Sequence, residues 1–375
     1  MLSKRWLCVA AFVLLTASAG IVTALSSEEE LGKKLFFDTD LSTPPGQSCA
    51  ACHDPAVGYT GPDSNINNHG AVYEGAFDGR FGNRKPPSAA YAGDSPSLNH
   101  QAPFIGGMFW DGRATGWILG DPLAEQAQGP FLNPLEQNNP NARVVIGKVL
   151  SSSYKTLFKT VCGKKYDMNE YYDCIGRSIA AYERSTEVSS FTSRYDEYLD
   201  GNSEALTEDE IAGLVLFEGK GKCANCHVPP LFTDFTYDNL GVPKNIENPF
   251  YDELAYNPMG SEWIDEGLGG FLNSIDYSSY GDEVGKMKVP TLRNVAKGSC
   301  EADYDPCAIK AYGHNGYFKS LEEIVHFYNT RDVPGSGWPA PEVSQNVNDV
   351  ELGSLGLLPE EELSIVAFLK TLSDE

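Results

Sequence analysis

Beyond its first two dozen residues, the chain has no apolar run long enough to cross a membrane. Basic residues are also scarce, because 28 Lys and Arg stand against 52 Asp and Glu and give a formal net charge of −24. Such an acidic chain disfavours nucleic acid and anionic lipid as partners, and it can steer a basic redox partner. Simple solubility of an exported protein explains the same charge, so composition does not choose between these interpretations.

The first residues depart from this pattern. Two basic residues precede an apolar run, residues 6–15, and small residues follow it. This pattern indicates an export signal with cleavage after Ala19 or Ala24, because the run is interrupted and short for a retained membrane anchor. Loss of residues 1–24 removes two positive charges, so we expect a mature chain of charge −26. Its predicted location is the periplasm or the cell surface, with no membrane span after cleavage.

Two stretches of the chain read Cys-x-x-Cys-His, at residues 49–53 and 223–227. In this pattern both thiols bond covalently to the vinyl groups of a haem, and the imidazole ligates its iron. Structural zinc is the alternative, because two Cys pairs can share one metal. The export signal and the His directly after each pair favour two c-type haems. The predicted haem residues are Cys49, Cys52, His53, Cys223, Cys226 and His227.

Four further cysteines follow the signal segment. In an oxidising compartment their spacing predicts two short-loop disulfides, Cys162–Cys174 and Cys300–Cys307. The alternative is a set of free, buried thiols.

Helix signals dominate around the haem motifs. Ser26 and Ser27 precede a run of Glu, while Thr207 and Ser320 each stand three residues before a Glu, as in a capping box. Pro359 opens a last amphipathic helix that we expect to run through Leu372. Between these signals lie stretches rich in Gly, Pro and Asn with no sustained period, at residues 54–94, 120–141 and 228–286.

A mature length of about 350 residues suits two domains, and one haem motif falls in each half. We expect a boundary near Glu187, with domains at residues 25–187 and 188–375. The predicted fold is all-α, with two c-type cytochrome domains, each around one covalently bound haem, and long irregular loops. The sequence has no internal repeat beyond the two haem motifs.

Further motifs accompany the haem motifs in one order along the chain. They are LGKKLFFD at 31–38, FWDGR at 109–113, EQAQGP at 125–130, VPTLRN at 289–294 and HNG at 314–316. Together they resemble the bacterial dihaem cytochrome c peroxidase and MauG superfamily over nearly the whole mature chain. The resemblance implies that hydrogen peroxide reacts at the N-terminal haem and that the C-terminal haem passes or stores electrons.

The resemblance also implies roles for residues around the first haem. Glu136 corresponds to the acid/base that moves a proton between the peroxide oxygens, and Gln126 and Pro130 shape the same pocket. Trp110 matches a tryptophan between the haems, where an easily oxidised indole can relay an electron. Without the resemblance, Glu136 would read as a solvated loop residue and Trp110 as a core aromatic.

The remaining ligand of the second haem separates the branches of the superfamily. In the peroxidases it is a Met fourteen residues after the His that corresponds to His314, and here that position is Tyr328. The MauG type has a tyrosine ligand there, and an anionic oxygen stabilises oxidised iron better than a thioether does. The alternative is that Tyr328 only packs and that another residue binds, namely Met287, Met259 or His326.

Two further ligands are predicted by correspondence. His69 lies sixteen residues past His53, where resting peroxidases carry a histidine on the first iron, but an exposed loop histidine is equally consistent with the sequence. The family also holds calcium between the haems. Its oxygen donors here would be Asn83 and the carbonyls of Ile309 and Ala311.

The resemblance therefore predicts a MauG-like dihaem peroxidase that oxidises a partner protein through a high-valent state shared by its two haems. One alternative is a cytochrome c peroxidase that removes peroxide with electrons from a small cytochrome c or cupredoxin. Another is a dihaem electron carrier without catalysis, against which the pocket around Glu136 argues. The MauG type has a Trp two residues before the second haem motif, where this chain has Gly221.

Overall fold

The computed structural model describes residues 24–165, 167–304 and 306–375. The predicted export signal, including a cleavage site after Ala19, lies outside the described residues. The described part is mostly helical and contains one two-stranded antiparallel sheet, in which Tyr237 pairs with Lys288. None of the helices within it is long and apolar enough to span a membrane. Its helices are α1 (Ser27–Phe37), α2 (Ser64–Asn68), α3 (Pro122–Leu132), α4 (Ala142–Ser151), α5 (Lys155–Cys162), α6 (Met168–Glu183), α7 (Arg194–Leu199), α8 (Glu208–Glu218), α9 (Gly267–Ser274), α10 (Leu321–Thr330) and α11 (Pro359–Lys370), and its strands are β1 (Tyr237–Asp238) and β2 (Met287–Lys288).

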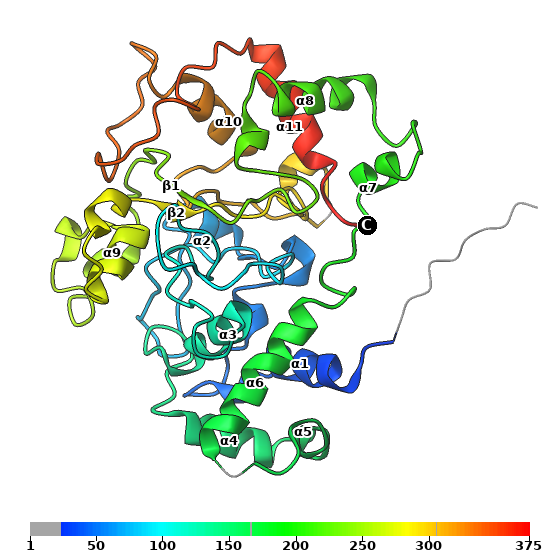
Figure 1. Cartoon of the computed structure of the whole chain (residues 1–375), viewed down its shortest axis with the longest axis vertical. Coiled ribbons are helices and arrows are strands. Elements are labelled where there is room, and N and C mark those ends of the chain that lie inside the picture. Colours follow the sequence, from blue (N-terminus) through cyan, green and yellow to red (C-terminus); the bar gives the residue numbers. More distant parts are fainter. Residues whose placement is uncertain (1–23, 166, 305) are drawn as a thin grey trace, which may run out of the picture.

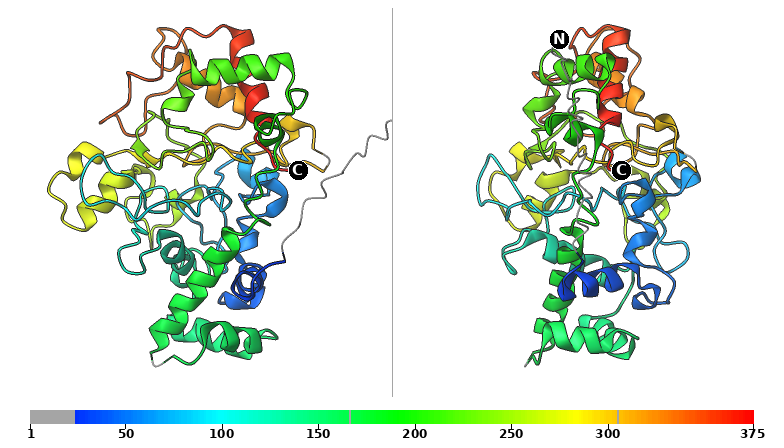
Figure 2. Two further views of the ribbon diagram at one scale, coloured as in Figure 1. Left: turned by 45° about the vertical axis from the view of Figure 1, so that its right-hand side comes forward. Right: turned by 90° about the vertical axis from the view of Figure 1, so that its right-hand side faces the viewer.

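The helices gather at two ends of an elongated molecule. Figure 1 shows α1 and α3 to α6 at the lower end and α8, α10 and α11 at the upper end, with long loops between them. The views of Figure 2 keep this arrangement. One large apolar cluster lies at each end, and its members come from residues 31–188 in one case and 195–372 in the other. The domain boundary near Glu187 stays a prediction, and it lies one residue before Val188, the last member of the first cluster.

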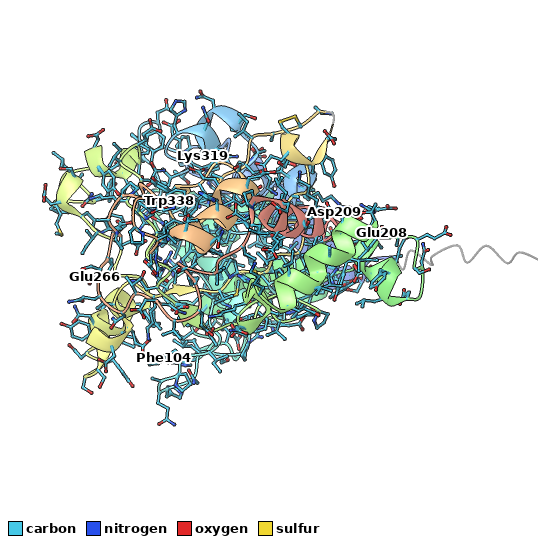
Figure 3. All side chains as sticks on the ribbon, turned by 90° about the horizontal axis from the view of Figure 1, so that it is seen from above. Phe104, Glu208, Asp209, Glu266, Lys319 and Trp338 are labelled. Atoms are coloured by element: carbon cyan, nitrogen blue, oxygen red, sulfur yellow. A yellow bond between two sulfur atoms is a disulfide. The ribbon has the colours of Figure 1, made fainter. Side chains whose placement is uncertain are left out.

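The predicted helix starts are confirmed. Ser26, Thr207 and Ser320 each accept a hydrogen bond from the backbone N–H of the Glu three residues later. Figure 3 labels Glu208 and Asp209 in the first turn of α8, where acidic side chains favour the positive end of the helix dipole. The last helix begins at Pro359 as expected and ends at Lys370, two residues before Leu372.

The expectation of irregular chain at residues 54–94, 120–141 and 228–286 was wrong in part, because α2, α3 and α9 lie within these stretches. The longest of the three is α3. Asp121 caps this helix by accepting hydrogen bonds from the N–H groups of Leu123 and Ala124. Gly129 and Pro130 lie within its last turns and weaken the sequence pattern of a helix. Packing against α6 stabilises α3 nevertheless, since Gly176 of α6 approaches the carbonyl of Ala124.

A packing arrangement is repeated at the two ends, although the sequence has no visible repeat. Helices α1 and α6 cross at Gly32, where a Cβ atom would lie 1.8 Å from the carbonyl oxygen of Ser178. Helices α8 and α11 cross at Gly213, where a Cβ atom would lie 1.9 Å from the carbonyl oxygen of Ser364. In both crossings only glycine permits this approach of the two backbones.

The aromatic residues next to these crossings repeat as well. Phe36 meets Tyr182 edge to face, with ring centroids 5.5 Å apart, and Phe217 meets Phe368 in the same way at 5.2 Å. Each aromatic on the second helix follows the contacting serine by four residues, which places both on one helix face. The two ends are therefore built on one packing plan.

Both predicted disulfides are confirmed. Cys162–Cys174 joins the end of α5 to α6, and Cys300–Cys307 closes a loop before α10. The cysteines of the haem motifs take no part in a disulfide.

Candidate active site

Two cavities lie beside the two Cys-x-x-Cys-His motifs. The first, which we call the N-terminal cavity, is lined by Cys49, Cys52, His53, Gln126, Pro130 and Glu136, among others. The second, the C-terminal cavity, is lined by Cys223, Cys226, His227, Met287 and Tyr328, among others. The structure thus brings the predicted attachment residues of each haem together with the residues predicted on its far side.

The two histidines are held in the same way. His53 Nδ1 lies 3.1 Å from the carbonyl oxygen of Tyr59, and His227 Nδ1 lies 2.9 Å from that of Phe232. A proton on Nδ1 satisfies this contact and leaves Nε2 as a free electron pair. Burial lowers the pKa of both histidines, which favours the neutral form that binds metal.

These donor sets fit c-type haem. Each cavity combines two free thiols three residues apart with a neutral imidazole whose second nitrogen is available. A zinc site would need the two Cys pairs together, whereas the structure places each pair at a separate cavity. The zinc interpretation therefore finds no support in this arrangement.

Trp110 lies between the cavities and lines both of them. Its side chain is only 9% exposed, and Nε1 donates a hydrogen bond of 2.9 Å to the carbonyl of Lys85. Next to it, Asp111 forms ion pairs with Arg84 and Arg113. The position of the indole is thus fixed by its own hydrogen bond and by the ion pairs of the following residue.

Lys85 was given no role from the sequence, yet it also lines both cavities. Its ammonium group donates to Thr60 Oγ1 at 2.9 Å and to the carbonyl of Pro86 at 3.0 Å. Burial lowers the pKa of Lys85 to about 8. A buried cation that contacts only neutral oxygens would be stabilised by an anionic group in either cavity, such as a haem propionate.

Glu136 lies in the wall of the N-terminal cavity. Burial raises the pKa of its carboxyl group, and nearby Arg113 partly opposes that shift. A carboxyl group with a raised pKa can both take and give a proton near neutral pH. The position and the ionisation of Glu136 are therefore compatible with the acid/base role predicted for it.

Glu183 is a second carboxyl group in the wall of this cavity, and no sequence pattern predicted a role for it. The residue lies on α6 and is 4% exposed, and its Oε2 atom has no hydrogen-bond partner. Burial raises its pKa to about 8. Only the helix packing places it here, since Glu183 stands 130 residues from His53 along the chain.

The alternatives to Tyr328 differ in where they lie. Met259 is 58% exposed, and His326 is exposed and pairs with Glu362, so neither lines the C-terminal cavity. Met287 does line it, together with Tyr328. The structure thus leaves two of the four ligand candidates at this cavity.

The predicted ligands His69 and Asn83 differ in their position relative to the N-terminal cavity. His69 is exposed, its Nδ1 lies 2.7 Å from the carbonyl of Asn65, and it does not line the N-terminal cavity. Asn83 does line that cavity. Of the two carbonyls predicted to join it on calcium, that of Ile309 already accepts a hydrogen bond from Asn67. The position of His69 agrees with an exposed loop histidine, and calcium binding stays a prediction.

Known proteins resemble this chain in sequence and in fold. Residues 26–204 match the family described as di-haem cytochrome c peroxidase. The methylamine utilization protein MauG of Paracoccus denitrificans (strain Pd 1222) is 32% identical, with 99% of this chain and 95% of that protein covered. The cytochrome c551 peroxidase of Nitrosomonas europaea is 31% identical over 79% of this chain and 71% of its own.

The crystal structure of the diheme peroxidase BthA from Burkholderia thailandensis E264 superposes with a TM-score of 0.76 at 30% identity. It covers 93% of this chain and 86% of its own. These similarities span nearly the whole chain, and membership of such a family implies two c-type haems. The chain therefore belongs to the dihaem cytochrome c peroxidase and MauG family of oxidoreductases.

Proposed function

We propose that the protein is an exported, MauG-like peroxidase that uses hydrogen peroxide at the N-terminal cavity to oxidise a partner protein. The single observation that carries the proposal is the shared wall at Trp110, which separates a cavity containing Glu136 from a cavity containing Tyr328. His53 and His227 would hold the two irons, and the four free thiols would attach the haems. When bound, the haems supply the iron that reacts with peroxide and the electrons that reduce it.

Glu136 would move the proton that peroxide cleavage requires. Its carboxylate takes a proton from the inner peroxide oxygen, and the resulting acid returns it to the outer oxygen, which leaves as water. Gln126 and Pro130 lie on α3 in the same wall and would limit where peroxide can sit.

Trp110 would carry oxidising equivalents between the cavities. Its indole is buried and hydrogen-bonded, so it can lose and regain an electron with little movement of its surroundings. Both cavities border it, so this one aromatic side chain connects them.

Tyr328 would hold the iron of the C-terminal cavity as a phenolate. Burial raises the pKa of its hydroxyl, so the phenolate needs a strong local positive charge. An oxidised iron supplies that charge, and the anionic oxygen in turn favours oxidised over reduced iron.

The partner is proposed to be a protein with a basic docking surface, since the chain carries 24 more formal negative than positive charges. The MauG type uses a Trp beside the second haem motif to draw electrons from its substrate, and Gly221 stands there in this chain. Because this chain lacks that Trp, its partner, or the residue through which electrons enter from the partner, would differ from that of the MauG type.

One experiment tests the proposal. One equivalent of peroxide is added to the fully oxidised protein, and optical and near-infrared spectra are recorded during a single turnover. The proposal expects both haems to change before any reductant is added. A change at one haem alone, with turnover only after addition of reduced cytochrome c, would instead support peroxide removal.

That second function has one observation in its favour, namely the 31% identity to a cytochrome c551 peroxidase. In that case Tyr328 and Trp110 would serve only to pass electrons inward from a small cytochrome c or cupredoxin. A dihaem carrier without catalysis would show no reaction with peroxide at either haem.

A further inference from the structure

Glu183 has a structural counterpart in the C-terminal half. Ser178 and Ser364 occupy the same place in the two helix crossings, against Gly32 and Gly213. Counting five residues onward from each serine reaches Glu183 on α6 and Leu369 on α11. Both residues are buried and both line the cavity of their own half.

The residue one turn earlier supports this correspondence. Ile179 and Ile365 each follow the contacting serine directly, are buried, and line the two cavities as well. In the C-terminal half, the residues at these two positions are an isoleucine and a leucine. Apolar side chains are expected there, because the positions lie at a buried helix crossing. The N-terminal half has a carboxyl group of similar size in place of the leucine. The fold does not need that group, because its duplicate does without it.

A buried carboxyl group at this place is costly. Glu183 is 4% exposed and its Oε2 lacks a hydrogen-bond partner, so its charged form loses hydration without compensation. The carboxyl group is therefore held mainly as the neutral acid at neutral pH, in agreement with its raised pKa.

The charged groups around Glu183 do not neutralise it. Arg184 favours the carboxylate but is bonded to Asp121, the cap of α3, at 2.8 Å, and Asp121 disfavours it. On α1, Lys33 pairs with Glu187 instead. Glu136, Lys85 and Cys49 of the first haem motif line the same cavity as Glu183. The ionisation of Glu183 is thus left sensitive to charge within the cavity.

We propose that Glu183 is a redox-linked proton site of the N-terminal cavity. Its carboxyl group releases one proton to solvent when one electron leaves the haem attached at Cys49 and Cys52 and passes to the second haem or the redox partner. It takes one proton back from solvent when one electron returns. The inference rests on the proposed haem attachment and adds to it a group that keeps the net charge of the cavity constant.

A net charge is unfavourable in a buried cavity of low dielectric constant. Loss of an electron adds one positive charge to the haem, and this charge favours the carboxylate of Glu183 over its neutral acid. By reciprocity, the carboxylate favours the oxidised haem, so proton release makes oxidation easier. The neutral acid of Glu183 therefore accompanies the reduced haem, and its carboxylate accompanies the oxidised haem.

The test is a spectroelectrochemical titration of the holoprotein between about pH 6 and about pH 9, which brackets neutrality. In the native protein the midpoint potential of the N-terminal haem should fall as pH rises, with a slope approaching one proton per electron. Glu183→Gln and Glu183→Leu should both clearly reduce the slope, and the slope that remains belongs to Glu136 and Lys85, which line the same cavity and have shifted pKa values. The leucine variant copies Leu369, which the same packing already accepts.

A second readout observes the proton directly. In reduced-minus-oxidised infrared difference spectra, the native protein should lose the C=O band of a protonated carboxylic acid on oxidation, and Glu183→Gln should lack that band. Glu187→Gln is the matched control, because Glu187 lies just beyond α6 but pairs with Lys33 at the surface. This control should keep both the slope and the band.

The failures can be told apart by counting haems. A native protein with two haems and no slope, or a Glu183→Gln variant with two haems and an unchanged slope, overturns the role of Glu183 while the proposed function stands. A native protein in which only the second motif carries haem overturns the proposed function, and the role of Glu183 with it.

Discussion

Trp110 Nε1 donates a hydrogen bond of 2.9 Å to the backbone carbonyl of Lys85, and both residues line both cavities. The wall between the cavities therefore contains an oxidisable indole and a buried ammonium group. This pair links the two halves chemically as well as spatially, and the consequences of removing it can be measured.

Trp110→Phe keeps an aromatic ring but removes the hydrogen bond and the easily oxidised indole. We expect the reaction of peroxide at the N-terminal haem to persist, while transfer to the second haem slows by about tenfold or more, equivalent to about 1.4 kcal/mol in the barrier. Stopped-flow spectra of both haems measure the two steps. Trp117→Phe is the control, since Trp117 is 42% exposed and lines neither cavity. Equal transfer rates in the Trp110 variant and the native protein would contradict the relay.

Glu136→Gln keeps the shape of the side chain but cannot accept a proton. The peroxide reaction should fall by about 10²–10⁴-fold, as expected for loss of a general acid/base. Because the first step needs the carboxylate, the native rate should rise with pH through the raised pKa of Glu136, and the variant should lose that rise. Glu208→Gln, at the exposed start of α8, is the control. An unchanged rate and pH profile would remove Glu136 from the mechanism.

Tyr328→Phe should alter the spectrum of the C-terminal haem and leave the peroxide reaction at the N-terminal haem intact. Tyr328→Met should raise the potential of the C-terminal haem, because a thioether favours reduced iron. The competing candidate is tested by Met287→Leu, which should leave the spectrum unchanged. The opposite result, with the spectrum sensitive to Met287 and not to Tyr328, would reassign the ligand.

Local patterns in the sequence predicted much of this site. The two Cys-x-x-Cys-His motifs, the serine and threonine caps and both disulfides depend on residues within a few positions of one another, and the structure contains each of them as expected. The roles of Trp110 and Glu136 were predicted from the resemblance to a family, because no local sequence pattern distinguishes them from other tryptophans and glutamates.

What the sequence could not predict depends on packing between distant segments. Helix α3 was missed because Gly129 and Pro130 disrupt its pattern, while the contact that stabilises it lies on α6. Lys85 and Glu183 look like surface residues until the fold encloses them. The repeated helix crossing was invisible because the two halves share only a few small and aromatic residues at the contact.

That crossing gives a prediction about stability. Gly32→Ala and Gly213→Ala would each place a Cβ within 2 Å of a backbone oxygen, so the helices must separate. We expect each to lower the free energy of unfolding by about 1–3 kcal/mol or more. Gly147→Ala on α4 is the control, because a Cβ there meets nothing within 4 Å and alanine should stabilise the helix by about 0.5–1 kcal/mol. Thermal unfolding of the holoprotein compares the three variants with the native protein. If Gly32→Ala and Gly213→Ala were as stable as the native protein, the crossings would tolerate a side chain.

The ion pair between Arg84 and Asp265 gives a prediction about acid stability. Two hydrogen bonds of 2.6 Å join them, and the buried Arg84 guanidinium lowers the pKa of Asp265 to about 2 from an ordinary value of 3.8. A depressed pKa means that the stabilisation is complete above pH 3.8 and is lost as pH falls toward 2.

Asp265→Asn should therefore be less stable than the native protein by about 3–5 kcal/mol at neutral pH, since Arg84 stays buried with one partner fewer. The difference in the free energy of unfolding between the native protein and the variant should shrink as the pH falls from about 4 to about 2. Urea unfolding at several pH values measures it, and a difference that does not depend on pH would mean that packing, rather than charge, stabilises this contact.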